Sequence, residues 1–152
     1  MSDPFSAPAR RAARLAAVQG LYQMETAADT PAQVMTDAMD GRLPRLEDER
    51  YDGEIDLDLM RRLLTVAVEN QEALDTTIAR SLSENWRLER LDAVARAILR
   101  AGAAELWARR DVPTAVVIDE YVEIAKAYFD APQPGFINAA LDACAKAIRE
   151  AA

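Results

Sequence analysis

The chain has 152 residues, of which 51% are hydrophobic, with one cysteine and no histidine. This length suits one ordinary domain that buries its own core. The residue counts exclude an intramolecular disulfide, histidine metal sites and catalytic pairs that use imidazole. The net charge is −8, but residues 25–60 hold eleven acidic and three basic residues and so account for the whole acidic excess.

Helical periodicity dominates the chain, and no strand-like alternation of useful length occurs. The expected elements, in chain order, are a helix from about Ala9 to Met24, a short helix from Pro31 to about Asp40 opened by a capping box at Thr30–Gln33, an exposed acidic loop at about 41–56, a long helix from Asp56 through Ile78, a turn with Ser83 and Trp86, a helix from Leu91 to Leu106, a helix from Val117 to about Phe129, and a last helix from Ile137 to Ile148.

These elements predict an all-α fold: a compact bundle of about seven helices in a single domain over residues 1–152. No apolar run approaches the roughly 18 residues that cross a bilayer. The first eight residues also lack the apolar stretch of a signal peptide. We therefore expect a cytoplasmic protein with no membrane partner.

Nothing in the sequence indicates an enzyme, a cofactor or a metal site. Neither of the glycine-rich phosphate loops, GxGxxG and GxxxxGK, occurs. Cys144 lies on the apolar face of the last helix, where a free cysteine acts as a small core side chain. Asp119, Glu120 and Glu123 fall opposite an apolar stripe, which favours a solvated face over a metal or acid–base site.

Three arginines near the start of the first helix are more informative. Arg10, Arg11 and Arg14 lie within about 100° of one another around the helix axis. Like charges there oppose the helix dipole, and an anionic partner would relieve that cost. Tyr22 lies about 80° from Arg14, so its ring could extend the same surface. The alternatives are a solvated basic turn and a tyrosine at the edge of the core.

The turn at 132–138 is a second candidate for nucleic-acid contact. It opens a helix, so backbone N–H groups and the positive end of the helix dipole are available to an anion. Phe136 and Ile137 are neighbours and cannot both face the core. If Ile137 is buried, Phe136 points partly outward and could stack on a base. The alternative is a hydrophobic staple that closes the turn.

Three stretches, taken together, resemble one known family. They are Ala9–Tyr22 (ARRAARLAAVQGLY), Arg96–Leu106 (RAILRAGAAEL) and Asp111–Asp142, which begins DVPTAVVIDEYVEIAKAYF. In this order they are similar to the NusB family of bacterial transcription antitermination factors. The resemblance implies an all-helical protein with two small helical subbundles packed together. It also implies no catalysis and no cofactor.

The family resemblance further implies partners. Its members bind the single-stranded boxA element of ribosomal RNA transcripts together with NusE, a small-subunit ribosomal protein. Through other Nus factors, the complex acts on RNA polymerase elongation. Residues matching the family's RNA contacts are Arg10, Arg11, Arg14, Tyr22 and Phe136, and residues matching a stretch implicated in the NusE interface are Ile118, Asp119, Glu120 and Glu123.

The chain also departs from the family pattern. Ala12 and Gly135 stand where some relatives carry a basic residue, and Ala95 replaces a frequent acidic one. The segment 27–58 is longer than in the best-known members. With fewer basic groups, we expect weak RNA binding by this chain alone and a stronger dependence on the partner. The alternative function is a helical protein–protein module, or a homodimer, with no RNA binding of its own.

Overall fold

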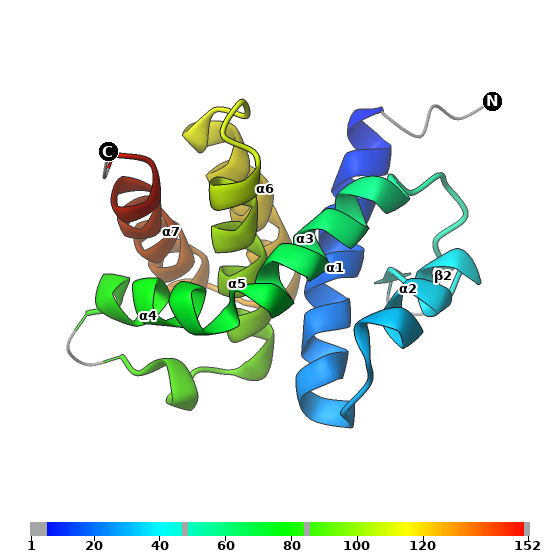
Figure 1. Cartoon of the computed structure of the whole chain (residues 1–152), viewed down its shortest axis with the longest axis horizontal. Coiled ribbons are helices and arrows are strands. Elements are labelled where there is room, and N and C mark those ends of the chain that lie inside the picture. Colours follow the sequence, from blue (N-terminus) through cyan, green and yellow to red (C-terminus); the bar gives the residue numbers. More distant parts are fainter. Residues whose placement is uncertain (1–5, 47–48, 84–85, 151–152) are drawn as a thin grey trace.

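A computed structural model describes residues 6–46, 49–83 and 86–150 (Figure 1). Its elements are α1 (Ala7–Ala27), α2 (Pro31–Met39), β1 (Arg45–Leu46), β2 (Glu49–Arg50), α3 (Leu57–Glu69), α4 (Gln71–Ser81), the 3-10 helix η1 (Leu88–Arg90), α5 (Ala93–Ala108), α6 (Thr114–Tyr128) and α7 (Gln133–Arg149). The predicted all-α fold with about seven helices is confirmed. No helix in the described ranges combines the length and apolarity that crossing a membrane demands.

Side-chain caps start several helices where the sequence placed them. The Thr30 hydroxyl accepts a hydrogen bond from the Gln33 backbone N–H at 3.1 Å, which confirms the start of α2. Only half of the predicted capping box forms, because the Gln33 amide donates to Asp37 at 3.0 Å. The carboxylates of Asp56 and Asp92 cap α3 and α5 in the same way, and each fixes the entry of a core helix.

Two expectations about the middle of the chain are wrong. The single long helix from Asp56 through Ile78 is divided at Asn70, whose side-chain amide and backbone N–H both donate to the Val66 carbonyl. The acidic segment 41–56 is not simply an exposed loop. Leu43 is buried, and β1 pairs antiparallel with β2 beyond it. The segment is therefore attached to the helices at its first end.

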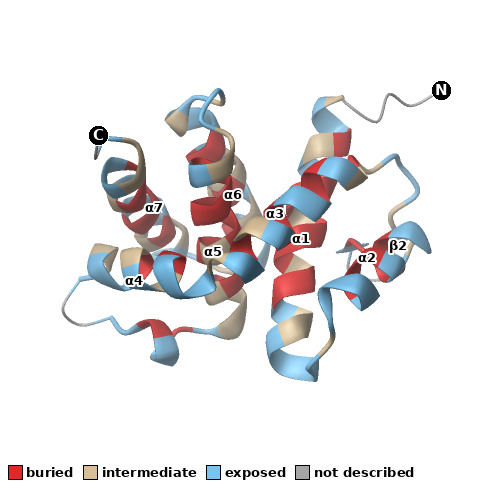
Figure 2. Cartoon of the chain, in the orientation of Figure 1, coloured by how far each residue is buried: buried red, intermediate tan, exposed pale blue. Residues whose placement is uncertain are grey.

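The helices form two groups that share one core. In Figure 1, α1, α2 and α3 lie on the side of the N-terminus, and α4 to α7 lie on the side of the C-terminus. The facing sides of α1, α3, α5, α6 and α7 are buried (Figure 2). Small side chains let α1 come close to its neighbours. A Cβ at Gly20 would lie 2.4 Å from Cγ1 of Val34, so the crossing of α1 and α2 requires glycine there.

An arginine from the last helix closes the end of α5. The Arg149 guanidinium donates to the backbone carbonyls of Leu106 at 2.9 Å, Arg109 at 2.9 Å and Val112 at 2.6 Å. The final carbonyls of a helix have no partner within the helix. Arg149 supplies one here, and it ties α7 to the turn between α5 and α6.

Candidate nucleic-acid interface

The three N-terminal arginines do not form one exposed cluster. The Arg11 side chain is 66% exposed and donates to Glu120 of α6 at 3.3 Å. Arg10 is half-buried on the same turn of α1. Arg14 is only 4% exposed and turns inward between α1 and α5. Arg14 therefore does not lie on the exposed surface where the helical spacing placed it, because its guanidinium is in the core, and Arg10 and Arg11 remain predicted phosphate contacts.

Arg14 belongs to a buried ionic cluster centred on Glu105 of α5. Its guanidinium donates to both Glu105 oxygens, from Nε at 2.9 Å and from NH2 at 2.8 Å. The Tyr121 hydroxyl and Arg109 also donate to this carboxylate, at 2.8 and 2.9 Å. Burial alone would lower the pKa of Arg14, but the hydrogen bonds and charge of Glu105 raise it. Burial alone would raise the pKa of Glu105, and Arg14 lowers it overall. Both groups stay charged.

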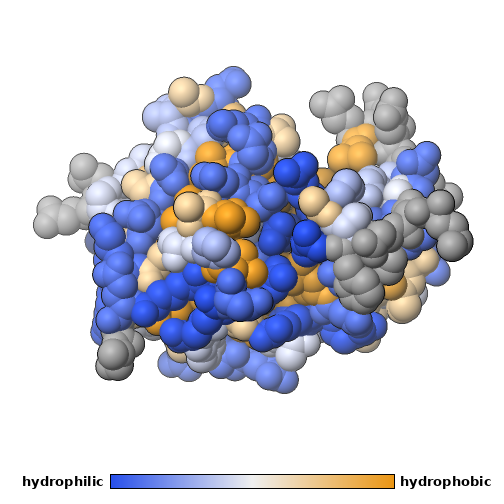
Figure 3. Space-filling model, turned by 90° about the horizontal axis from the view of Figure 1, so that it is seen from above, coloured by the Kyte–Doolittle hydropathy of each residue, from blue (hydrophilic) through white to orange (hydrophobic). Residues whose placement is uncertain are grey.

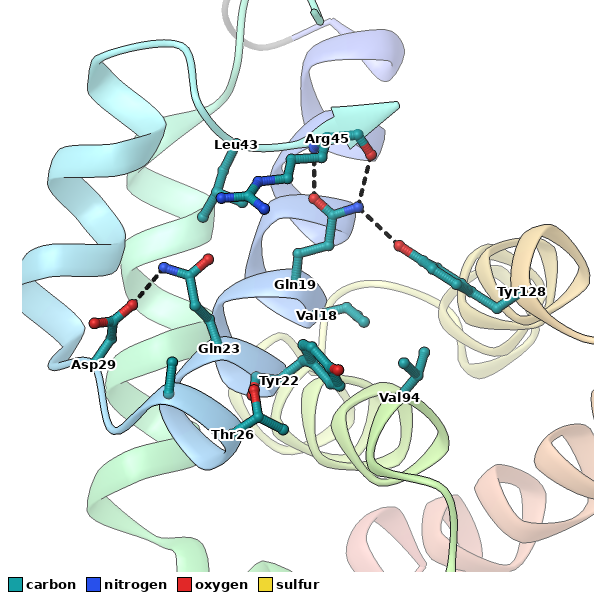
Figure 4. Close-up of a pocket in the computed structure, with 11 residues that line it drawn as sticks. Val18, Gln19, Tyr22, Gln23, Thr26, Asp29, Leu43, Arg45, Val94 and Tyr128 are labelled. Carbon is teal, nitrogen blue, oxygen red and sulfur yellow. Dashed lines mark hydrogen bonds between the residues drawn. The ribbon is translucent and has the colours of Figure 1, made fainter. Parts of the chain in front are cut away.

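Tyr22 lies on the second half of α1, at the edge of a pocket (Figure 4). Its ring is 41% exposed, so it is not a core residue. Tyr128, at the end of α6, lines the same pocket and is equally exposed. Sequence reasoning missed Tyr128 because its spacing matched the apolar stripe of α6. Spacing along one helix could not show that Tyr128 is exposed, because its burial depends on which other elements cover the last turn of α6.

Phe136 is half-buried at the start of α7, while Ile137 beside it is fully buried. The ring of Phe136 stacks on Trp86 with centroids 4.5 Å apart and planes tilted by 32°. Trp86 is 42% exposed and lies in the segment before η1. The structure thus adds the larger and more exposed ring of Trp86 to Phe136, the aromatic residue predicted at this site. Sequence reasoning had assigned Trp86 only to a turn.

The acidic residues of α6 border a groove against α1. Asp119, Glu120, Glu123 and Arg11 line it together with apolar side chains of both helices. Glu120 is half-buried and ion-paired with Arg11, so it is not on a fully solvated face as expected. Ile118 is 5% exposed and packs in the core, so it supports α6 without presenting its side chain. In the view from above, hydrophilic side chains cover most of the visible face, with small hydrophobic areas between them (Figure 3).

Cys144 is fully buried, as expected, and its Sγ lies 3.4 Å from the Ser81 hydroxyl. Burial raises the pKa of this thiol, although the hydrogen bond with Ser81 acts in the opposite direction. Among the described residues, no group of three or more cysteine or acidic side chains is arranged to hold a metal ion. The chemistry available at the surface described above is hydrogen bonding, ion pairing and stacking.

Comparison with known proteins identifies relatives that all belong to one family. The model of the NusB family matches residues 11–146. The transcription antitermination protein NusB of Caulobacter vibrioides is 50% identical over 145 residues, covering 93% of this chain and 95% of that protein. NusB of Brucella ovis is 46% identical over 146 residues, covering 96% of this chain and 85% of the relative.

Solved structures agree in fold. NusB of T. maritima superposes with a TM-score of 0.75 at 33% identity, covering 96% of this chain and 93% of that one. A chain from the structure of antitermination factors NusB and NusE in complex with double-stranded RNA gives a TM-score of 0.76 at 26% identity. That match covers 93% of this chain and 99% of the other.

Proposed function

The chain belongs to the NusB family, and from this premise we propose that it is a transcription antitermination factor that binds boxA RNA together with NusE. In this role it acts in the cytoplasm, with other Nus factors, on elongating RNA polymerase. The observation that carries the proposal is the match over nearly the whole chain to a protein solved with NusE and RNA. No step of this function requires a catalytic residue or a cofactor.

Arg10 and Arg11 hold RNA phosphates, and Tyr22 and Phe136 contact bases. The exposed guanidinium of Arg11 and the exposed ring of Tyr22 lie on one helix, eleven residues apart. At 1.5 Å per residue this is roughly 16 Å, a span of a few nucleotides. Phe136 works as a pair with Trp86, whose ring is the more exposed of the two. Arg14 is a positioning residue that anchors α1 to α5.

NusE binds along the groove between α1 and α6. Asp119 and Glu123 are exposed there and offer negative charge, and Ile118 holds the helix from the core side. Glu120 pairs with Arg11, so the protein-binding groove and the RNA-binding arginine share one contact. A basic partner group that takes over Glu120 would free Arg11 for phosphate. This arrangement predicts that NusE strengthens RNA binding.

The test is a fluorescence-anisotropy titration of boxA RNA with and without NusE. The double variant R10Q/R11Q removes two charges from the proposed surface. A matched control, R61Q/R110Q, removes two exposed charges from α3 and from the turn after α5. A third variant, D119N/E123Q, changes only the proposed NusE groove.

The proposal predicts sequence-preferring binding that NusE strengthens, that R10Q/R11Q weakens and that R61Q/R110Q leaves nearly unchanged. D119N/E123Q should reduce only the strengthening by NusE. Equal effects of both arginine pairs would refute the assigned surface. Absence of binding in both conditions would refute RNA recognition and leave the protein–protein module.

A further inference from the structure

The pocket beside Tyr22 is assembled from parts of the chain that are distant in sequence. It encloses about 680 Å³ between α1, the segment leading into β1, the start of α5 and the end of α6. Its apolar surface comes from Val18, Leu43 and Val94, and its aromatic rings from Tyr22 and Tyr128 (Figure 4). Because an acidic segment supplies one wall, the pocket depends on how that segment is held.

Gln19 holds the wall in place. Its Oε1 accepts the Arg45 backbone N–H at 2.6 Å, and its Nε2 donates to the Arg45 carbonyl at 2.9 Å. The same Nε2 donates to the Tyr128 hydroxyl at 2.8 Å. Both amide hydrogens and the amide oxygen are therefore engaged within the protein. Gln19 is a positioning residue that joins α1, β1 and α6, and it has no hydrogen left to offer a ligand.

Gln23, one turn further along α1, offers a fixed acceptor. Its Nε2 donates to Asp29 at 2.6 Å and to Asp37 at 2.9 Å. Since carboxylates only accept hydrogen bonds, these contacts fix which end of the amide is nitrogen. The Oε1 points away from Asp29 toward the pocket (Figure 4), and no described residue donates to it. A ligand with an N–H group would find an oriented partner here.

Arg45 offers a donor next to this acceptor. Its backbone is held by Gln19, while its side chain runs along the pocket toward Leu43 and Gln23 (Figure 4). The guanidinium donates no hydrogen bond to any residue in the described ranges. A guanidinium and a carbonyl oxygen side by side complement an acceptor next to an N–H. The Watson–Crick edge of an unpaired nucleobase has this pattern.

The pocket suits a base better than a phosphate. Asp29 lines it, and the Gln23 oxygen faces it, so an anion would meet negative groups beside the single cation of Arg45. A neutral planar base would instead meet apolar side chains, a tyrosine face and the donor–acceptor pair. Aromatic stacking of one base changes affinity by roughly 5- to 150-fold.

We propose that this pocket receives one unpaired base of the bound RNA, packed against Tyr22 and recognised along its edge by Gln23 and Arg45. The inference rests on the proposed function, because it concerns the same RNA. It extends the recognition surface to Arg45, in the segment that is long in this chain. That segment is then part of the binding site and gives it base selectivity.

The test is a double-perturbation experiment on RNA and protein. A series of boxA RNAs, each with one abasic position, is titrated by fluorescence anisotropy in the presence of NusE. R45Q removes the guanidinium and keeps the backbone bonds to Gln19. R42Q is the matched control, since Arg42 is exposed, lies in the same segment, does not line the pocket and sits 3.7 Å from Asp37.

At one position the abasic site should weaken wild-type binding by about tenfold or more. R45Q should weaken binding of the intact RNA by roughly 5- to 100-fold. At that one position only, the loss of affinity caused by the abasic site should be smaller for R45Q than for wild type, because R45Q has already lost the contact with the base edge while the stacking on Tyr22 remains. Y22L should show the same coupling at the same position, while R42Q should show the full abasic penalty at every position.

The outcomes separate the two proposals. If R45Q and R42Q weaken all RNAs by the same factor, Arg45 acts only through its charge and the base pocket is refuted, while the RNA-binding function stands. If wild type binds boxA RNA neither alone nor with NusE, both proposals fall together.

Discussion

Replacing Arg14 with methionine tests whether this arginine stabilises the core or contacts RNA. In R14M, Glu105 loses the three hydrogen bonds from Arg14 but keeps those from Tyr121 and Arg109. The buried Glu105 carboxylate therefore still has hydrogen-bond donors in this variant. Charge-assisted hydrogen bonds contribute about 1.5–3 kcal/mol, so we expect the free energy of unfolding to fall by about 2–3 kcal/mol.

Removing the acidic partner, Glu105, should lower the free energy of unfolding further. In E105L, Arg14 would lose its hydrogen-bonded partner at a position that is 4% exposed and keep only the Glu120 carboxylate, 3.8 Å from its guanidinium, and breaking a buried pair in this way costs about 3–5 kcal/mol. R11M is the surface control, because its side chain is 66% exposed and paired with Glu120. Exposed ion pairs contribute about 0–1 kcal/mol. Urea unfolding followed by circular dichroism measures all three.

The salt dependence of RNA affinity supplies the second measurement. Each phosphate contact to a single strand contributes about 0.7 to the slope of log affinity against log salt concentration. R11M should lower that slope by about 0.7, and R14M should leave it unchanged. The reasoning is refuted if the free energy of unfolding of R14M is within about 0.5 kcal/mol of the wild-type value while its salt slope falls by the amount expected for one lost phosphate contact, about 0.7.

Three further perturbations probe the fold. R149M removes the donor to three backbone carbonyls at and just after the end of α5, so the free energy of unfolding should fall by about 2–4 kcal/mol in the same urea assay. G20A places a Cβ 2.4 Å from Val34; the clash should outweigh the gain in helix propensity and leave a net loss of about 1–2 kcal/mol, and a raised melting temperature would contradict this. The lowered pKa of Glu105 stabilises the fold above the ordinary pKa of glutamate, about 4.3, and this contribution is lost as the pH falls through the lowered value. Unfolding between pH 6 and pH 3 should therefore show a smaller loss of stability in R14M than in wild type, and equal losses would contradict the assignment.

The sequence was sufficient for the helices because their apolar stripes and caps are local properties. Thr30, Asp56 and Asp92 cap helices close to the positions that the pattern predicted. The break at Asn70 was not predictable from periodicity, because the apolar stripe continues in phase across it. The break depends on an asparagine amide that competes for one carbonyl, and the stripe carries no sign of it.

The site was predicted only in part, because its geometry depends on contacts between distant residues. Helical spacing placed Arg10, Arg11 and Arg14 on one side of α1, but only the position of Glu105 on α5 decides that Arg14 turns inward. In the same way, the exposure of Trp86 depends on Phe136 from α7. Periodicity assigns a residue to a face of its own helix, and packing decides what covers that face.

The buried ion pair has a consequence for the order in which the chain is made. Arg14 and Glu105 are 91 positions apart, so the ribosome completes α1, α2 and α3 long before α5 emerges. Until then the inner face of α1 carries an unpaired guanidinium among its alanines, and burying it without a counter-charge is unfavourable. The N-terminal helices are thereby discouraged from collapsing into a closed unit of their own during synthesis. They stay open for the helix that completes them.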